Sequence, residues 1–557
     1  MTDSRPPLRP PDCTDAFGEG MSSRRGGVMF LVVCLLVAFW DLSGRSVYHK
    51  DLPRFATIAR EMIRSGDWLV PTQYGETYAN KPILYVWAVA LPSALVGDPT
   101  AFTLRFANAL ALVATAWGAA LWGTARSGSK AVGRAAGWMV LTTWFVTELG
   151  RVGRPDMLAT AASTVAAAFV DRSVLGRGGR RDALWAGLAM GAGLLAKGPV
   201  TLLLPLLLIV LPRAAIPWRE RLSRGRPLSA LSIALAVAAL WLVPVTMRDG
   251  WSNLGRLLGQ VSERVEGRGN HIESPLYYLV EFPMSAAPWT GFYLAAAVAF
   301  AFRRVRAALG DGAHVAAAGV ALLVFSAVPT KEIRYASILV PPLAVATAAC
   351  AAHLVARARR ADLLAHALRA GGIVALLLAI ASKVLLARVD TPAFYVAMPV
   401  YLGVSGFFAV RAASRVTDAP GLAGRMVGLA LVAAAVAPCV YWSYLGRYLV
   451  TNQDQENSAV LAALEPGVPA VILGGTDVPG SLTPDDLYDV GATAGFTKDV
   501  ARIPSPAASP RETVICLDVQ ADAVAKARGE TPVETLRRSR ADGRTLVVLR
   551  FGPRSGG

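Results

Sequence analysis

The chain has 557 residues, of which 54% are hydrophobic and 17% charged, whereas soluble domains carry about 25% charged residues. Apolar stretches long enough to cross a bilayer as helices recur as far as residue 446, which excludes an ordinary soluble protein. The formal net charge of +17 would suggest a nucleic-acid partner. Much of this charge, however, lies in short basic clusters between apolar segments, as in cytoplasmic loops of membrane proteins. We therefore expect a polytopic membrane protein with no nucleic-acid partner.

The N-terminal residues 1–27 are rich in proline, glycine and charge, and they predict a disordered cytoplasmic tail. The apolar run 28–42 follows Arg24 and Arg25, an arrangement similar to the start of a signal peptide. No small-residue cleavage site follows this run. We therefore expect 28–42 to be retained as the first membrane helix.

Thirteen further apolar runs predict helices. They lie near 83–97, 101–124, 132–149, 156–173, 183–196, 199–212, 228–247, 277–302, 313–329, 335–356, 364–387, 393–411 and 422–446. The run 83–97 is short and contains Pro92, which interrupts a helix, so we place it on the outer face of the membrane. Thirteen crossings then remain, and the arginine-rich loops all fall on one side. The positive-inside rule places the N-terminus in the cytoplasm and the C-terminus outside, in an inner or plasma membrane.

This topology predicts a tail (1–27), a transmembrane domain (28–446) with a long outer loop (43–100), and a C-terminal extracytoplasmic domain (447–557). Within the last domain, buried-strand patterns lie at 468–475, 512–519 and 544–551, and helix patterns at 484–493 and 520–529. We expect residues 447–557 to form a small α/β domain.

The outer loop opens with an amphipathic helix pattern. Phe55, Ile58 and Met62 recur at helical spacing, which predicts a helix that lies in the membrane interface. Asp51 and Arg54 stand at its N-terminal end. Asp51 is a candidate catalytic base, although aspartate is also a favoured helix cap.

A second acid, Asp156, lies at the outer start of a predicted crossing, where an aspartate is also stabilised by the helix dipole. Asp51 and Asp156 belong to the first two outer loops, so both emerge on the same side of the membrane. Two carboxylates on one face can divide proton transfer and substrate positioning between them.

Cationic side chains also gather on the outer face. They are Lys81, Lys197, Arg264, Arg268, Lys331 and Arg334. Such groups in a recessed site would bind a phosphate or diphosphate, and the alternative is that they reach toward lipid headgroups. His271, in the same outer region, is a weaker candidate because lone histidines are more often structural than catalytic.

Several short motifs occur together and in order. They are D-x-x-R-F-A-x-I-A-R-E-M at 51–62, S-G-D-W-L-V-P at 65–71, Y-A-N-K-P at 78–82, L-R-F-A-N-A-L at 104–110, P-D-M-L at 155–158, A-K-G-P at 196–199, H-I-E-S-P-L-Y-Y at 271–278 and K-E-I-R-Y at 331–335. In these motifs the chain resembles the polyprenyl-phosphate-sugar-dependent glycosyltransferases of the GT-C fold. It is most similar to the lipid A aminoarabinose transferase (ArnT-like) group, which is related to the dolichyl-phosphate-mannose protein mannosyltransferases.

The resemblance implies an all-α polytopic membrane protein of the GT-C fold. About thirteen transmembrane helices and amphipathic outer-face helices would be joined to a small C-terminal α/β extracytoplasmic domain. Asp51 looks like the essential first-loop acid of the family, and Asp156 like its second-loop carboxylate. The lipid-phosphate site would be lined by Arg54, Tyr78, Lys81 and Tyr335, with Lys81 nearest the phosphate and Arg264 or Arg268 adding a cation. The chain departs from the family's patterns at Leu52 and Asn80, where an acidic residue is usual.

The implied reaction transfers a sugar from a polyprenyl-phosphate-linked donor to a lipid, glycan or protein acceptor. The cations would stabilise the leaving phosphate, and Asp51 would take the proton of the attacking hydroxyl. An in-line attack by this hydroxyl would invert the anomeric centre. We expect no cofactor and no divalent metal, because side chains supply the positive charge. The five cysteines form no C-x-x-C motif that would indicate a metal site.

Two alternatives remain at this point. A lipid-linked oligosaccharide polymerase or ligase would keep the phosphate site and differ in its acceptor. A secondary transporter would instead place ionisable groups near the bilayer midplane, whereas here they gather at one surface.

Overall fold

The structure is a computed structural model. It describes residues 19–43, 51–73, 75–267 and 272–356, and in the C-terminal region 470–473, 500–503, 513–517, 522, 525–526, 532–539 and 545–550. The chain divides into two compact units, which are described separately. The first consists of Met1–Asp41, Ala79–Tyr85 and Ala107–Leu445, and the second of Leu42–Tyr78, Val86–Phe106 and Gly446–Gly557.

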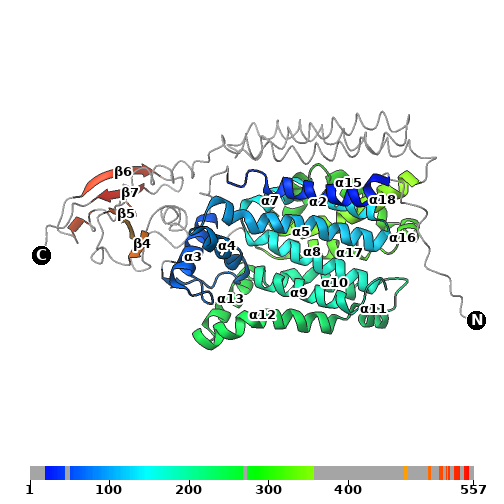
Figure 1. Cartoon of the computed structure of the whole chain (residues 1–557), viewed down its shortest axis with the longest axis horizontal. Helices are drawn as coiled ribbons and strands as arrows, with labels where there is room; N and C mark the ends of the chain where they lie inside the picture. The colour runs from blue at the N-terminus through cyan, green and yellow to red at the C-terminus, as the bar shows by residue number, and fades with distance from the viewer. Residues whose placement is uncertain are drawn as a thin grey trace, which may run out of the picture. The chain divides into compact units, whose positions relative to one another are not determined.

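The first unit is a helical bundle in which the longer helices run side by side (Figure 1). Its described helices are α1 (Glu19–Ser22), α2 (Arg24–Phe39), α5 (Ala101–Ser127, which begins in the second unit), α6 (Lys130–Leu141), α7 (Trp144–Val152), α8 (Pro155–Val174), α9 (Arg180–Lys197), α10 (Leu203–Val210), α11 (Trp218–Gly225), α12 (Pro227–Asp249), α13 (Ser252–Val265), α14 (Tyr277–Ser285), α15 (Thr290–Ala301), α16 (Arg303–Leu309), α17 (Ala313–Ala327) and α18 (Val340–Ala356). Two 3₁₀ segments, η1 (Pro199–Leu202) and η2 (Ile333–Leu339), precede α10 and α18.

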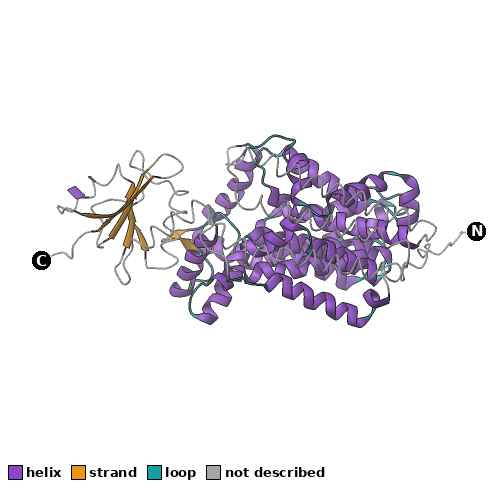
Figure 2. Ribbon diagram, turned by 90° about the horizontal axis from the view of Figure 1, so that it is seen from above, coloured by secondary structure: helices purple, strands orange, loops and turns teal. Residues whose placement is uncertain are grey.

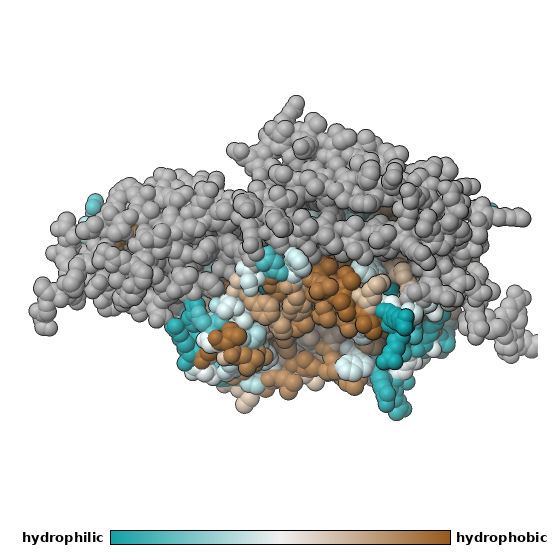
Figure 3. Space-filling model, turned by 45° about the horizontal axis from the view of Figure 1, so that its top comes forward, coloured by the Kyte–Doolittle hydropathy of each residue, from teal (hydrophilic) through white to brown (hydrophobic). Residues whose placement is uncertain are grey.

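Three described helical segments are long and apolar enough to cross a membrane: Ala101–Ser127, Trp218–Asp249 and Ile333–His353. Helix α12 exposes large apolar side chains along its length, among them Leu228, Leu240 and Met247. The space-filling view shows a broad apolar area, with hydrophilic side chains gathered toward its ends (Figure 3). Such a surface suits contact with lipid, because a water-exposed apolar patch of this kind is rare on soluble monomers.

Small residues allow the long helices to approach closely. Gly187 and Gly191, one turn apart on α9, face α12, and a Cβ atom at Gly187 would lie 2.7 Å from the Ala230 carbonyl oxygen. A Cβ atom at Gly191 would lie 2.6 Å from Cβ of Val237. Packing through small residues is the usual means by which membrane helices associate, because burial from lipid gains little hydrophobic energy.

A buried ion cluster joins α5, α8 and the segments that follow α10 and α16. Asp171 of α8 accepts hydrogen bonds from Nε1 of Trp122 (2.7 Å), Nη1 of Arg126 (2.7 Å) and Nη2 of Arg213 (2.6 Å). Asp311 lies 2.9 Å from Arg126 and 3.4 Å from Arg213. Burial alone would raise the pKa of Asp311, but the two guanidinium groups outweigh burial and hold it below its ordinary value.

The second unit contains α3 (Asp51–Ser65), the short strands β1 (Thr72–Gln73) and β2 (Glu76–Thr77), and most of α4 (Leu84–Val96). The predicted helix after Asp51 is confirmed, and its apolar residues Phe55, Ile58 and Met62 are buried. Arg60 of the same helix is also buried. Its guanidinium donates two 2.7 Å hydrogen bonds to the Asp98 carboxylate, which supply the countercharge that a buried arginine needs.

The C-terminal region holds a five-stranded sheet in the order β4-β3-β5-β7-β6, seen clearly in Figure 2. Its strands are β3 (Ala470–Leu473), β4 (Val500–Ile503), β5 (Thr513–Leu517), β6 (Val533–Ser539) and β7 (Thr545–Arg550). Strand β3 pairs in parallel with β4 and β5, whereas β7 is antiparallel to β5 and β6. Strands β3, β5 and β7 lie within the three predicted strand runs, and the predicted helix 484–493 lies outside the described residues.

Several predicted helices differ from those observed. The run 132–149 is divided into α6 and α7, because the Trp144 amide donates to the Ala287 carbonyl (2.9 Å) and so leaves the helical pattern. The run 277–302 is likewise divided into α14 and α15. The segment 248–276, which lies between the predicted helices 228–247 and 277–302, contains a further helix, α13. The last three predicted crossings, from 364 to 446, lie outside the described residues.

We predict that Asp171→Asn destabilises the protein by about 3–5 kcal/mol, because it leaves two buried guanidinium groups without their shared countercharge. Thermal unfolding in detergent would show a clearly lower midpoint. The matched control is Glu220→Gln, which breaks the exposed pair with Arg224 on α11 and should change stability by less than about 1 kcal/mol. Equal effects of the two substitutions would contradict this role for the cluster.

Candidate active site on the first unit

Asp156 lies in the first turn of α8, directly after Pro155, and only 4% of its surface is exposed. Its Oδ1 atom accepts a hydrogen bond from the ammonium of Lys197, the last residue of α9. The guanidinium Nε of Arg334, in η2, lies 3.4 Å from the same oxygen. A buried carboxylate requires such partners. The structure therefore brings together three residues that the sequence analysis selected from widely separated motifs.

Three cationic side chains surround the aromatic ring of Tyr335 in this cluster. The Lys197 ammonium lies 4.1 Å from the ring centroid, and the guanidinium carbons of Arg264 and Arg334 each lie 5.9 Å from it. Cations within about 6 Å of an aromatic ring are attracted to its face. The ring thus collects three of the predicted ligand-binding cations, one each from α9, α13 and η2.

Glu332 was missed by the sequence analysis, although it lies within the K-E-I-R-Y motif. Its carboxylate accepts a hydrogen bond from Nη2 of Arg334, and its Oε1 atom lies 3.3 Å from the Tyr335 hydroxyl, which donates to it. An acid three residues before a tyrosine on a helical turn could have indicated this contact. Glu332 adds a second negative charge to the cluster.

Lys331 and Arg264 differ in their surroundings. The Lys331 ammonium is buried and donates to the backbone carbonyls of Glu273 (2.9 Å) and Pro329 (3.3 Å), so that it holds two chain segments together. Arg264, at the end of α13, has the Tyr335 ring as its contact and no carboxylate partner among the described residues. Of the two arginines that the sequence analysis could not separate, Arg264 therefore faces the cluster. Arg268 and His271 lie outside the described residues.

Lys81 lies just before α4, in the first unit, and its ammonium donates to the Asn80 carbonyl at 3.1 Å. The other predicted site residues belong to the second unit. Asp51 is the first residue of α3, and its Oδ1 atom lies 3.5 Å from Nη1 of Arg54. Tyr78 is buried, and its ring packs edge-on against Phe55 with centroids 6.4 Å apart. Asp51 thus occupies a helix start, as both its catalytic and its capping interpretation require.

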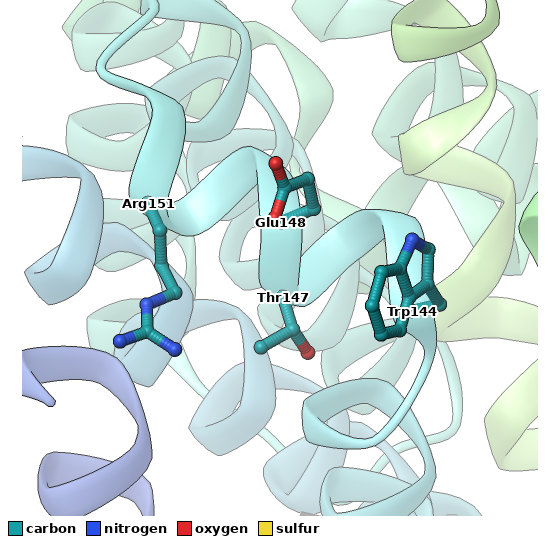
Figure 4. Close-up of a pocket in the computed structure, with 4 residues that line it drawn as sticks. All are labelled: Trp144, Thr147, Glu148 and Arg151. Carbon is teal, nitrogen blue, oxygen red and sulfur yellow. The ribbon is translucent and has the colours of Figure 1, made fainter. Parts of the chain in front are cut away.

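A small recess lies along one face of α7 in the first unit. It is lined by Trp144, Thr147, Glu148 and Arg151, which recur at helical spacing (Figure 4). The surrounding side chains leave no room for a water molecule, and Arg151 donates to the Trp40 carbonyl. The recess is therefore part of the packing between α7 and the end of α2.

Known proteins of similar sequence belong to one class of membrane transferase. A family model described as dolichyl-phosphate-mannose-protein mannosyltransferase matches residues 80–243. The undecaprenyl phosphate-alpha-4-amino-4-deoxy-L-arabinose arabinosyl transferase of Aeromonas salmonicida (strain A449) is 28% identical over 450 residues, which cover 77% of this chain and 80% of that protein. The protein of the same name from Pectobacterium carotovorum subsp. carotovorum (strain PC1) is 30% identical over 284 residues, 49% of each chain.

The fold is also found in solved structures. The crystal structure of ArnT from Cupriavidus metallidurans bound to undecaprenyl phosphate has a TM-score of 0.70 at 20% sequence identity. The match covers 96% of this chain and 100% of that one. Together with the sequence relatives, these matches confirm the resemblance that the motifs predicted. The relatives and the long apolar helices also identify the chain as an integral membrane protein.

We predict that Lys197→Met destabilises the first unit by about 3 kcal/mol, because it removes one partner of a buried ion pair and leaves Asp156 with Arg334. Thermal unfolding in detergent is again the measurement. Lys130→Met is the control, because Lys130 is an exposed residue at the start of α6. Unfolding midpoints that agree for the two variants would show that the Asp156–Lys197 pair contributes nothing to the fold.

Proposed function

Since the chain is an ArnT-like membrane glycosyltransferase with the GT-C fold, we propose that it transfers a sugar from a polyprenyl-phosphate-linked donor on the extracytoplasmic face. The acceptor would be a hydroxyl or phosphate group of a lipid, glycan or protein. The observation that carries the proposal is the guanidinium of Arg264, which contacts the Tyr335 ring beside a cluster whose other cations are already paired.

The charges of the cluster support an anionic ligand. Lys197 is neutralised by Asp156, and Arg334 lies between Asp156 and Glu332. Arg264 is then the cation in excess, and it would gain a countercharge from a phosphate. Arginine suits this task because its planar guanidinium can donate two parallel hydrogen bonds to phosphate oxygens.

The proposed mechanism gives separate tasks to the cations and to the acids. Arg264 and Lys81 hold the donor phosphate and stabilise the negative charge that grows on it as the bond to the sugar breaks. Asp51 takes the proton from the attacking hydroxyl of the acceptor. Attack from the side opposite the leaving phosphate inverts the anomeric centre. Asp156 keeps Lys197 and Arg334 in place beside Tyr335.

Two observations support this reaction class over the alternatives. The relatives named above are transferases that use undecaprenyl phosphate sugars. In the described part of the first unit, the buried acids Asp156, Asp171 and Asp182 lie near the ends of α8 and α9, whereas a transporter places ionisable groups near the middle of its helices.

We predict that Asp51→Asn lowers the rate of sugar transfer by about 100-fold or more, because a general base contributes about 10²–10⁴-fold to a reaction. Transfer from a radiolabelled undecaprenyl-phosphate sugar by purified protein in nanodiscs measures the rate. Asp249→Asn, at the C-terminal end of α12, is the control and should retain full activity. Undiminished transfer by a folded Asp51→Asn variant would remove Asp51 from the mechanism.

We also predict that Arg264→Gln weakens the binding of undecaprenyl phosphate by about 10–100-fold, because hydrogen bonds to charged groups are worth about 1.5–3 kcal/mol. Native mass spectrometry or a fluorescence titration in detergent would measure the affinity. The control is Arg256→Gln on the exposed part of the same helix, α13. If both variants bind as the wild type does, Arg264 does not hold the phosphate.

A further inference from the structure

We infer that Glu332 is a positioning residue that orients Arg334 and Tyr335 for donor binding, and this inference rests on the proposed function. Its carboxylate reaches the two side chains that border the proposed phosphate site.

Two hydrogen bonds hold the backbone of Glu332 in place. Its carbonyl oxygen accepts a hydrogen bond from the hydroxyl of Tyr278 on α14 (3.2 Å) and another from the Tyr335 amide (3.0 Å). The residue has an extended backbone at the N-terminal end of η2. From this fixed point the carboxylate is directed back over the turn that contains Arg334 and Tyr335.

The carboxylate then determines how Arg334 divides its contacts between two acids. The guanidinium uses Nη2 for Glu332, while its Nε lies 3.4 Å from Asp156. Without Glu332, Asp156 would be the remaining acid among the described salt-bridge partners of Arg334. Arg334 would then move toward Asp156 and compete with Lys197 for the same carboxylate oxygen.

Tyr335 is restrained from the same side. Its hydroxyl donates to Oε1 of Glu332 at 3.3 Å, and its ring faces Lys197 and Arg264. A half-buried tyrosine whose hydroxyl is held by a carboxylate has little freedom to tilt. Glu332 thereby sets the plane of the ring against which the Arg264 guanidinium lies, and so fixes the cation that we assign to the phosphate.

This role makes a prediction opposite to that of simple electrostatics. Removing a negative charge near a phosphate site should strengthen phosphate binding if Glu332 acts only through its charge. If Glu332 acts by orienting Arg334 and Tyr335, its removal should weaken binding. The sign of the change therefore separates the two roles.

The test is Glu332→Gln, which keeps the shape of the side chain and removes its charge. We expect the KM for an undecaprenyl-phosphate sugar to rise about 10-fold with kcat nearly unchanged, because a loss of ground-state binding raises KM alone. Glu332→Asp, which keeps the charge but is one methylene shorter, should give a smaller rise. The matched control, Glu273→Gln, removes an exposed acid from the neighbouring outer segment and should leave both constants unchanged.

A double-mutant cycle shows whether Glu332 acts through its neighbour. In an Arg334→Gln background, the effect of Glu332→Gln on KM should shrink to less than about 2-fold, since contacting residues are not additive. The inference is overturned if Glu332→Gln lowers KM, behaves as Glu273→Gln does, or has its full effect without Arg334. If the wild-type protein itself neither binds undecaprenyl phosphate nor transfers its sugar, the proposed function falls as well.

Discussion

The structure depends on the rule that a charge taken out of water must meet a partner. Helix α8 carries a buried carboxylate near each end, Asp156 and Asp171. At a rise of about 1.5 Å per residue, they are separated along the helix by about 22 Å. Asp156 connects α8 to α9 and η2, and Asp171 connects it to α5 and to the segment after α10. Two sets of ion pairs therefore fix the ends of the bundle, while small residues such as Gly187 and Gly191 allow its middle to pack.

The ion pairs at one end of α8 balance their charges, whereas those at the other end leave one positive charge unmatched. Around Asp171, the acids Asp171 and Asp311 are matched by Arg126 and Arg213, so the described cluster is closed and suited to a structural role. Around Asp156, the arginine at the end of α13 adds a cation that no described carboxylate neutralises. A structural cluster and a candidate ligand site are thus built from the same residue types, and the unmatched charge distinguishes them.

Much of the fold could be predicted from the sequence because local patterns determine it. The helical spacing of Phe55, Ile58 and Met62 predicts α3, and the apolar run that ends at Lys197 predicts α9. The break between α6 and α7 could not be predicted, because it depends on the carbonyl of Ala287, far away in the chain. Helix α13 could have been found, since its leucines recur at helical spacing, but its polar residues favoured a loop.

The site was only partly accessible from the sequence. Motifs selected Asp156, Lys197, Arg334 and Tyr335 as outer-face residues, but their mutual contacts depend on how α8, α9 and η2 pack. Spacing could not decide between Arg264 and Arg268. It also could not show that the Lys331 ammonium donates hydrogen bonds to backbone carbonyls. The pairing of Arg60 with Asp98 joins residues from different elements and is likewise invisible to a periodicity argument.

The central claim is that the cluster around Tyr335 binds the phosphate of a polyprenyl-phosphate donor. An electron cryomicroscopy structure of the full chain with undecaprenyl phosphate tests it most directly. The account predicts phosphate density within hydrogen-bonding distance of the Arg264 guanidinium, with Arg334 still bound to Glu332. Phosphate density at the other end of α8, beside Arg126 and Arg213, with none near Tyr335, would contradict it.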